Sequence, residues 1–207
     1  MSNFDNTEHN ERTPGNEYNS AYNSSCAYYA NNKGAKRTSE NSINPNSNVR
    51  ILEVDGHNTA LLNQSAMLLV KYFMHVAGDD VDNININDWS RLNNIITGTR
   101  DGKHRIFLAF VDGEDSPVGI GGINRQGCAM HLYVMPEYRG KGVARALVQE
   151  RFDKGAWFTT VLKTNFASLS LMRKVGLHEM YDYENLSIFV RPSDFTSGDM
   201  ELDFLKA

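Results

Sequence analysis

The segment that decides the fold is LYVMPEYRGKGVARALV, residues 132–148. An apolar run ends at Val134, and Pro136 stops it because proline cannot donate to a strand ladder. Apolar residues then recur at helical spacing, which predicts a helix from about residue 140 to 153. The first N–H groups of a helix have no partner within it and lie at the positive end of the helix dipole. The segment therefore predicts an anion site where the turn meets the helix.

The turn itself, Arg139–Gly142, suits a phosphate or pyrophosphate. Its two glycines permit left-handed backbone angles and a close approach of the ligand, and Arg139 and Lys141 add positive charge. The turn lacks both the GxxxxGK[ST] frame of a P-loop and the GxGxxG fingerprint of dinucleotide-binding proteins. The glycines of GIGGIN, residues 119–124, fall inside a predicted strand, where close packing or a bulge explains them.

The remaining pattern predicts a mixed sheet with helices on both faces. Strands are expected at 49–54, 105–115, 116–127, 128–135, 158–164, 177–183 and 186–192, and helices at 60–78, 89–97, 140–153 and 166–176. Asp112–Gly113 is expected in the turn between the second and third strands, and Asp88 as the cap of the second helix. The order is typical of an α/β (α+β) fold with a mostly antiparallel sheet of six to seven strands.

The two ends of the chain differ from this globular part. Residues 1–48 are rich in Asn, Ser, Glu, Gly and Thr and almost lack aliphatic side chains, which predicts a disordered N-terminal tail. Residues 192–207 are expected to form a C-terminal tail. One folded domain is therefore predicted over residues 49–191.

Composition excludes several classes of protein. The 207-residue chain has a net charge of −4, which argues against a general nucleic-acid binder. The two cysteines form no CxxC pair and the six histidines show no ligand spacing, so no metal site is expected. The lack of a disulfide framework indicates a reducing compartment, and the sequence shows neither an apolar stretch of membrane-spanning length nor an N-terminal signal core, so a cytoplasmic protein is expected.

Two segments carry a resemblance to a known family. RGKGVA at 139–144 matches the pattern Arg/Gln-x-x-Gly-x-Gly/Ala, and NFASLSLMRKVGL at 165–177 places an Asn before a helix that ends in Gly and an apolar residue. Both segments, and the order of elements over about 49–191, resemble the GNAT superfamily of N-acetyltransferases. The resemblance implies a GNAT-like fold and acetyl-CoA as the cosubstrate.

The resemblance also implies where acetyl-CoA would bind. Its pyrophosphate would lie on the main-chain N–H groups of the turn and first helical residues, and its pantetheine beside the preceding strand. A second set of residues would flank the pantetheine from the later helix. The implied cofactor-binding residues are Leu132, Tyr133, Val134, Arg139, Gly140, Lys141, Gly142, Val143, Ala144, Asn165, Ser168 and Met172. Asn165 is equally well explained as a simple N-cap, and both roles are compatible.

The catalytic groups are less evident from the sequence. Family members often carry, in the later helix, a tyrosine that protonates the departing thiolate, and Met172 stands at that position here. Tyr181, Tyr183, Tyr133 or a water remain as sources of that proton. His131 has a suitable side chain for a general base, although simple alternation places it on the face opposite Val134 unless a bulge intervenes. A structural role for His131 stays open, as does an acyl-carrying role for Cys128.

The predicted function is transfer of an acetyl group from acetyl-CoA to an amine of a small molecule or protein, by direct attack in a ternary complex. The acidic loop residues Asp79, Asp80 and Asp82 are candidates for attracting a cationic amine. The alternative is a catalytically weak or inactive GNAT-like module that binds CoA or a protein partner. Modification of nucleobases is a third, less favoured interpretation. The protein is expected to be a monomer or homodimer.

Overall fold

The computed structural model describes residues 48–78, 84–182 and 184–192, all of which belong to one compact unit of the chain, residues 34–207. The predicted tails therefore lie almost entirely outside the described residues, as do Asp79, Asp80, Asp82 and Tyr183.

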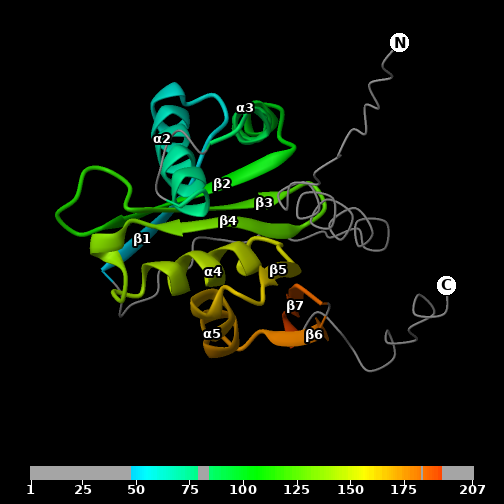
Figure 1. Cartoon of the computed structure of the whole chain (residues 1–207). Helices are drawn as coiled ribbons and strands as arrows, with labels where there is room; N and C mark the ends of the chain where they lie inside the picture. Colours follow the sequence, from blue (N-terminus) through cyan, green and yellow to red (C-terminus); the bar gives the residue numbers. More distant parts are fainter. Residues whose placement is uncertain (1–47, 79–83, 183, 193–207) are drawn as a thin grey trace, which may run out of the picture. The chain divides into compact units, whose positions relative to one another are not determined.

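Seven strands form a single mixed sheet in the order β1-β2-β3-β4-β5-β7-β6 (Figure 1). Every neighbouring pair is antiparallel except β4 and β5, which are parallel. The strands are β1 (Val49–Glu53), β2 (His104–Val111), β3 (Gly119–Asn124), β4 (Cys128–Val134), β5 (Phe158–Leu162), β6 (His178–Asp182) and β7 (Leu186–Val190). The predicted order of elements and the mostly antiparallel sheet are thus confirmed.

The four α-helices of the described residues cover the two faces of the sheet. They are α2 (Thr59–Val76), α3 (Ile86–Arg100), α4 (Val143–Asp153) and α5 (Phe166–Lys174). Helices α2 and α3 lie on one face with a core that includes Leu69, Phe73 and Ile95, and α4 and α5 lie on the other with Leu147 and Met172 (Figure 1). Among the described residues, none of the helices combines the length and apolar character needed to cross a membrane.

Helix α3 begins earlier than predicted, because its cap is Asn85 and not Asp88. The Asn85 side chain accepts hydrogen bonds from the N–H groups of Asn87 and Asp88, at 2.9 and 3.2 Å. The Asp88 carboxylate in turn accepts from the Asn85 N–H, which completes a capping box. The prediction for Asp88 was wrong since it serves as the third helical residue of the box.

The glycines of β3 let α4 pack closely on the sheet. Close packing was one of the two explanations that the sequence offered for these glycines. A Cβ added at Gly119 would lie 3.1 Å from a methyl carbon of Val143 and 3.2 Å from one of Leu147. A Cβ at Gly121 would lie 3.0 Å from the side chain of Arg151. Residues larger than glycine would therefore push α4 away from the strand.

A β-bulge interrupts β4 next to these glycines. Met130 pairs with Gly122 and Tyr133 pairs with Ile120, so β4 contains one residue more than β3 between these pairs. His131 lies within the bulge and has a φ of 56°, the only positive φ of a non-glycine residue in the described part of the chain. On its other side, β4 pairs with β5 only at Cys128 and Ala129, and beyond them the two strands diverge.

We expect Leu147→Ala to destabilise the domain by about 3 kcal/mol, because Leu147 is fully buried between α4 and the sheet and its truncation leaves a cavity. Urea denaturation followed by circular dichroism measures this loss. The exposed Arg145 of the same helix provides the control, since Arg145→Ala removes no buried contact. Equal stability of Leu147→Ala and the wild type would contradict the packing of α4.

Candidate active site

The turn before α4 presents free backbone donors. Gly140 and Gly142 have φ angles of 75° and 84°, and Gly142 precedes the helix without any capping side chain. Helix α4 therefore starts at Val143, three residues later than predicted. Its first hydrogen bond runs from the Ala146 N–H to the Gly142 carbonyl at 3.0 Å, so the N–H groups of Val143, Ala144 and Arg145 have no acceptor within the helix. This arrangement is suited to an anion.

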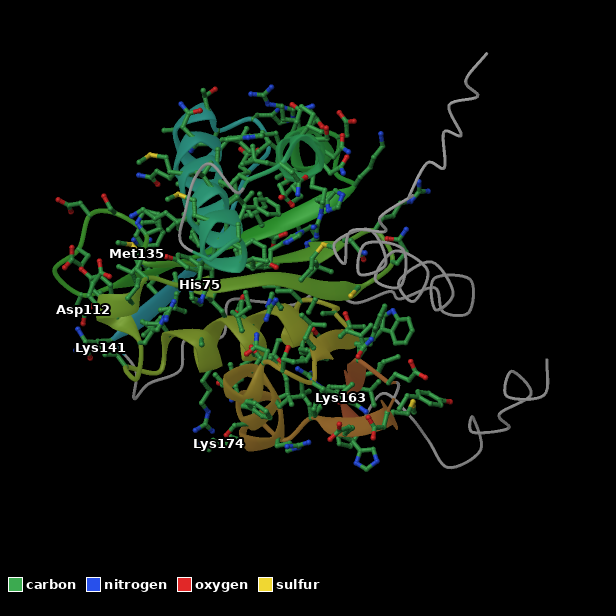
Figure 2. All side chains as sticks on the ribbon, viewed as in Figure 1. His75, Asp112, Met135, Lys141, Lys163 and Lys174 are labelled. Carbon is green, nitrogen blue, oxygen red and sulfur yellow. The ribbon has the colours of Figure 1, made fainter. Side chains whose placement is uncertain are left out.

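Side-chain contacts fix this turn to the end of β4. Nε of Arg139 donates to the carbonyl of Val134 at 3.1 Å, and Nζ of Lys141 lies 4.9 Å from the centre of the Tyr138 ring. Tyr138 in turn donates to a carboxylate oxygen of Glu114 at 2.6 Å. Figure 2 shows Lys141, Met135 and Asp112 at the same end of the sheet. The two cations predicted to surround the anion site are thus tied to it by specific contacts.

Beyond the bulge, one edge of β4 is open. The Met135 N–H donates to the Val118 carbonyl at the start of β3, at 2.9 Å. Because main-chain groups alternate in direction along a strand, those of Leu132 and Val134 point the other way, toward the space that β5 has left. At the closed end of this opening, the Thr159 hydroxyl donates to the Ala129 carbonyl at 2.8 Å. The open edge can bind an extended, amide-containing ligand.

His131 lies on the α2 side of the sheet. Its ring is 5.5 Å from that of Tyr72 and 6.2 Å from that of Phe73, whereas Val134 packs in the core on the α4 side. The bulge therefore does not bring His131 to the face of Val134. The side chain is 7% exposed, and its Nδ1 has no hydrogen-bond partner among the described residues.

This environment keeps His131 neutral. Burial, followed by the positive charges of Arg91, His104 and Arg151, lowers the pKa of His131 to about 3. At neutral pH the imidazole accordingly offers a nitrogen lone pair but has little tendency to retain a proton.

Of the two candidate tyrosines beyond β4, only Tyr181 belongs to the described residues. Tyr183 lies outside the described residues. Tyr181 of β6 pairs with Ile188 of β7, which pairs with Thr160 of β5, so two strands, β5 and β7, separate Tyr181 from the opening between β4 and β5.

The residues predicted along α5 mostly have structural contacts. Asn165 caps the helix and accepts from the Ser168 N–H at 3.0 Å, which confirms the simple capping role. Met172 is 2% exposed and packs in the core on the α4 side. Cys128 is fully buried and packs as a small core residue.

Two polar residues at the opening were missed by the sequence analysis. Thr160 follows the last pair of the β4–β5 ladder, and its hydroxyl oxygen is buried without a hydrogen-bond partner among the described residues. Arg151 of α4 is 1% exposed and donates to the Met130 carbonyl at 3.0 Å. The position of Arg151, four residues after Leu147 on the apolar face of the helix, was a usable signal.

Comparisons with known proteins agree with this geometry. Residues 102–192 match the family model of the acetyltransferase (GNAT) domain. The comparison with curated proteins gave no match. The resemblance to the GNAT superfamily that RGKGVA and NFASLSLMRKVGL predicted is confirmed.

Solved structures share the fold at low sequence identity. The PaiA N-acetyltransferase from Thermoplasma acidophilum, solved in complex with coenzyme A, matches with a TM-score of 0.52 and 16% identity, over 69% of this chain and 98% of that one. An acetyltransferase from Streptococcus agalactiae matches with a TM-score of 0.50 and 16% identity, over 70% of this chain and 98% of that one. These similarities establish the fold.

We expect acid to destabilise the protein through His131. The pKa of His131 is about 3 in the folded state against 6.5 for an ordinary histidine, so the unfolded chain binds one more proton between these values. The free energy of unfolding should therefore fall by about 3 kcal/mol from pH 7 to pH 4. Urea denaturation across this range measures the slope.

His131→Asn is the matched control for this experiment, because asparagine tolerates a positive φ and does not titrate. The variant should lose most of the dependence on pH. An identical slope in the variant and the wild type would show that His131 is not the responsible group.

Proposed function

We propose that this protein, whose residues 102–192 match the GNAT acetyltransferase domain, transfers an acetyl group from acetyl-CoA to an amine. One observation supports this proposal above the others. The open edge of β4 leads directly into a turn with two left-handed glycines, and this turn ends at the uncapped N-terminus of α4. The working domain is proposed to span residues 49–191, since β1 and helices α2 and α3 complete the sheet and one of its cores.

The residues present fit acetyl-CoA at both ends of the opening. The N–H groups at the start of α4 supply donors for the pyrophosphate, and Arg139 and Lys141 supply charge beside them. The main-chain groups of Leu132 can pair with the amides of pantetheine as a neighbouring strand would, since the Val134 carbonyl already accepts from Arg139. Asn165 and Ser168 are proposed to flank the pantetheine from the start of α5.

The open edge also places a donor for the chemical step. Transfer by direct attack requires a neutral amine held against the thioester carbonyl, and negative charge develops on the carbonyl oxygen. The Val134 N–H is the proposed donor to that oxygen, because it points into the opening and is fixed by the strand. The cosubstrate supplies an activated acyl group with a thiolate leaving group.

His131 is proposed to orient the amine, as a neutral acceptor of a hydrogen bond. Its low pKa means that the proton of the amine would pass onward to solvent and not remain on the imidazole. For the leaving thiolate, Tyr181 and Tyr183 are the proposed proton sources, with a water as the substitute. The acceptor is an amine of a small molecule or a protein.

One observation favours a second function. Met172 stands where family members often carry the acidic tyrosine, and it is buried in the core without a proton to give. A domain that binds CoA without turning it over would fit this feature. Release of free CoA in the presence of a panel of amines, detected with a thiol reagent, would count against this second function.

The binding site is tested by Gly142→Glu. We expect at least a hundredfold loss of acetyl-CoA affinity by isothermal titration calorimetry, because the added carboxylate would compete for the N–H groups at the start of α4 and repel the pyrophosphate, an effect of about 3 kcal/mol or more. Gly176→Glu is the matched control, since Gly176 has an equally positive φ of 85° and open space around it but lies after α5.

Loss of binding in Gly142→Glu with retention in Gly176→Glu supports the site. Equal affinities of both variants and the wild type would show that the turn before α4 is not the anion site. Absence of acetyl-CoA binding in the wild type would reject the proposed function.

The role of His131 is tested by comparing His131→Gln with His131→Met, two unbranched side chains of similar size with the same backbone cost at a φ of 56°. Glutamine retains an acceptor atom and methionine does not, so an orienting role predicts a kcat roughly tenfold lower in His131→Met than in His131→Gln. If His131 acts as a full general base, both variants should lose about a hundredfold or more. Tyr181→Phe in the same assay reports whether that hydroxyl protonates the thiolate.

A further inference from the structure

A buried arginine connects α4 to the bulge of β4. The Arg151 side chain is 1% exposed, and its Nε donates to the Leu147 carbonyl one turn earlier in the helix, at 3.1 Å. This bond holds the guanidinium against its own helix, while Nη1 reaches across to the Met130 carbonyl at 3.0 Å. Met130 is the residue immediately before His131, so Arg151 binds the strand directly at the bulge.

The neighbouring strand leaves space for this arrangement. Gly121 of β3 lies opposite the bulge, and a Cβ there would be 3.0 Å from both Cδ and Nε of Arg151 and 3.3 Å from Cζ. The backbone of Gly121 is not in the left-handed region. Position 121 therefore requires glycine because Arg151 approaches closely, and not because of its backbone conformation. Gly121 and Arg151 therefore act as a pair.

The bulge needs such support. A histidine at a φ of 56° is in a backbone region that costs free energy for most residues other than glycine, and it persists where surrounding contacts impose it. Burying a guanidinium is also costly unless its hydrogen bonds are satisfied. An apolar side chain of similar length would fill the same space at less cost, which indicates that the hydrogen bond to Met130 serves a purpose other than stability.

We propose that Arg151 is a positioning residue, which fixes the bulge of β4 and thereby holds the edge of Leu132 and Val134 in the orientation that receives acetyl-CoA. Its role in binding rests on the proposed function. Because the anion site and Arg151 belong to the same helix of eleven residues, α4 sets the distance between the pyrophosphate site and the reacting strand. The positive charge of Arg151 also helps to keep His131 neutral.

The first test uses the ligand-free protein and does not depend on acetyl-CoA. In Arg151→Met, the amides of Tyr133 and Met135, which face β3, should exchange with deuterium at least about tenfold faster than in the wild type, while those of β7 remain unchanged. Arg151→Lys keeps the charge and one donor and should give an intermediate rate. Unchanged exchange at Tyr133 and Met135 in Arg151→Met would overturn the proposal, and so would a uniform increase over the whole sheet, which indicates general destabilisation.

The second test is a double-mutant cycle on acetyl-CoA affinity, measured by calorimetry. Gly121→Ala and Arg151→Met should each weaken binding about tenfold, since each removes the guanidinium from the Met130 carbonyl. The double variant should bind no more weakly than Arg151→Met alone, because the contact that Gly121→Ala disturbs is already lost. Gly122→Ala is the control, since its Cβ would point to Arg105 and Met130 and not to Arg151.

The outcomes separate this proposal from the proposed function. Additive losses in the cycle, or full affinity in Arg151→Met, would reject a positioning role for Arg151. Failure of the wild type to bind acetyl-CoA would reject the proposed function, while hydrogen exchange would still decide whether Arg151 fixes the bulge.

Discussion

The divergence of β4 from β5 is the constraint on which the site depends. Two parallel strands that pair at only two positions leave main-chain donors and acceptors without a strand partner along the rest of their facing edges. Such groups require a partner, because an unpaired buried backbone group costs about 1–3 kcal/mol. Here the Arg139 side chain bonds to the Val134 carbonyl, the Thr159 hydroxyl to that of Ala129, and the remaining edge is available to a ligand.

Polar atoms gather around this opening within a largely apolar core. The buried Nδ1 of His131 and the hydroxyl oxygen of Thr160 have no hydrogen-bond partner among the described residues, and both come from strands that border the divergence. Strain and unsatisfied polar groups of this kind tend to concentrate where a protein binds or reacts. From the α4 side, the guanidinium of Arg151 bonds to the Met130 carbonyl at the bulge of β4, so side chains from both faces of the sheet contact this strand.

Most elements of the fold could be predicted because their signals are local. The alternation of VRILE and the helical spacing of Val143 and Leu147 depend only on neighbours in the chain, and they located the strands and helices to within a few residues. The start of α3 was missed because Asn85 and Asp88 both resemble caps, and only the backbone angles decide between them. Likewise, Asn165 could be recognised as a cap from its position alone.

The sequence by itself determined the turn before α4 that is proposed to bind an anion, since two glycines and two cations before an amphipathic helix mark that turn without any distant contact. Only the tertiary structure decided the bulge at His131, the face on which His131 lies and the contacts of Arg151. A bulge shifts the alternation of a strand by one residue and depends on what packs against it. Gly121 and Arg151 are thirty positions apart in the chain, and no local pattern shows that one makes room for the other.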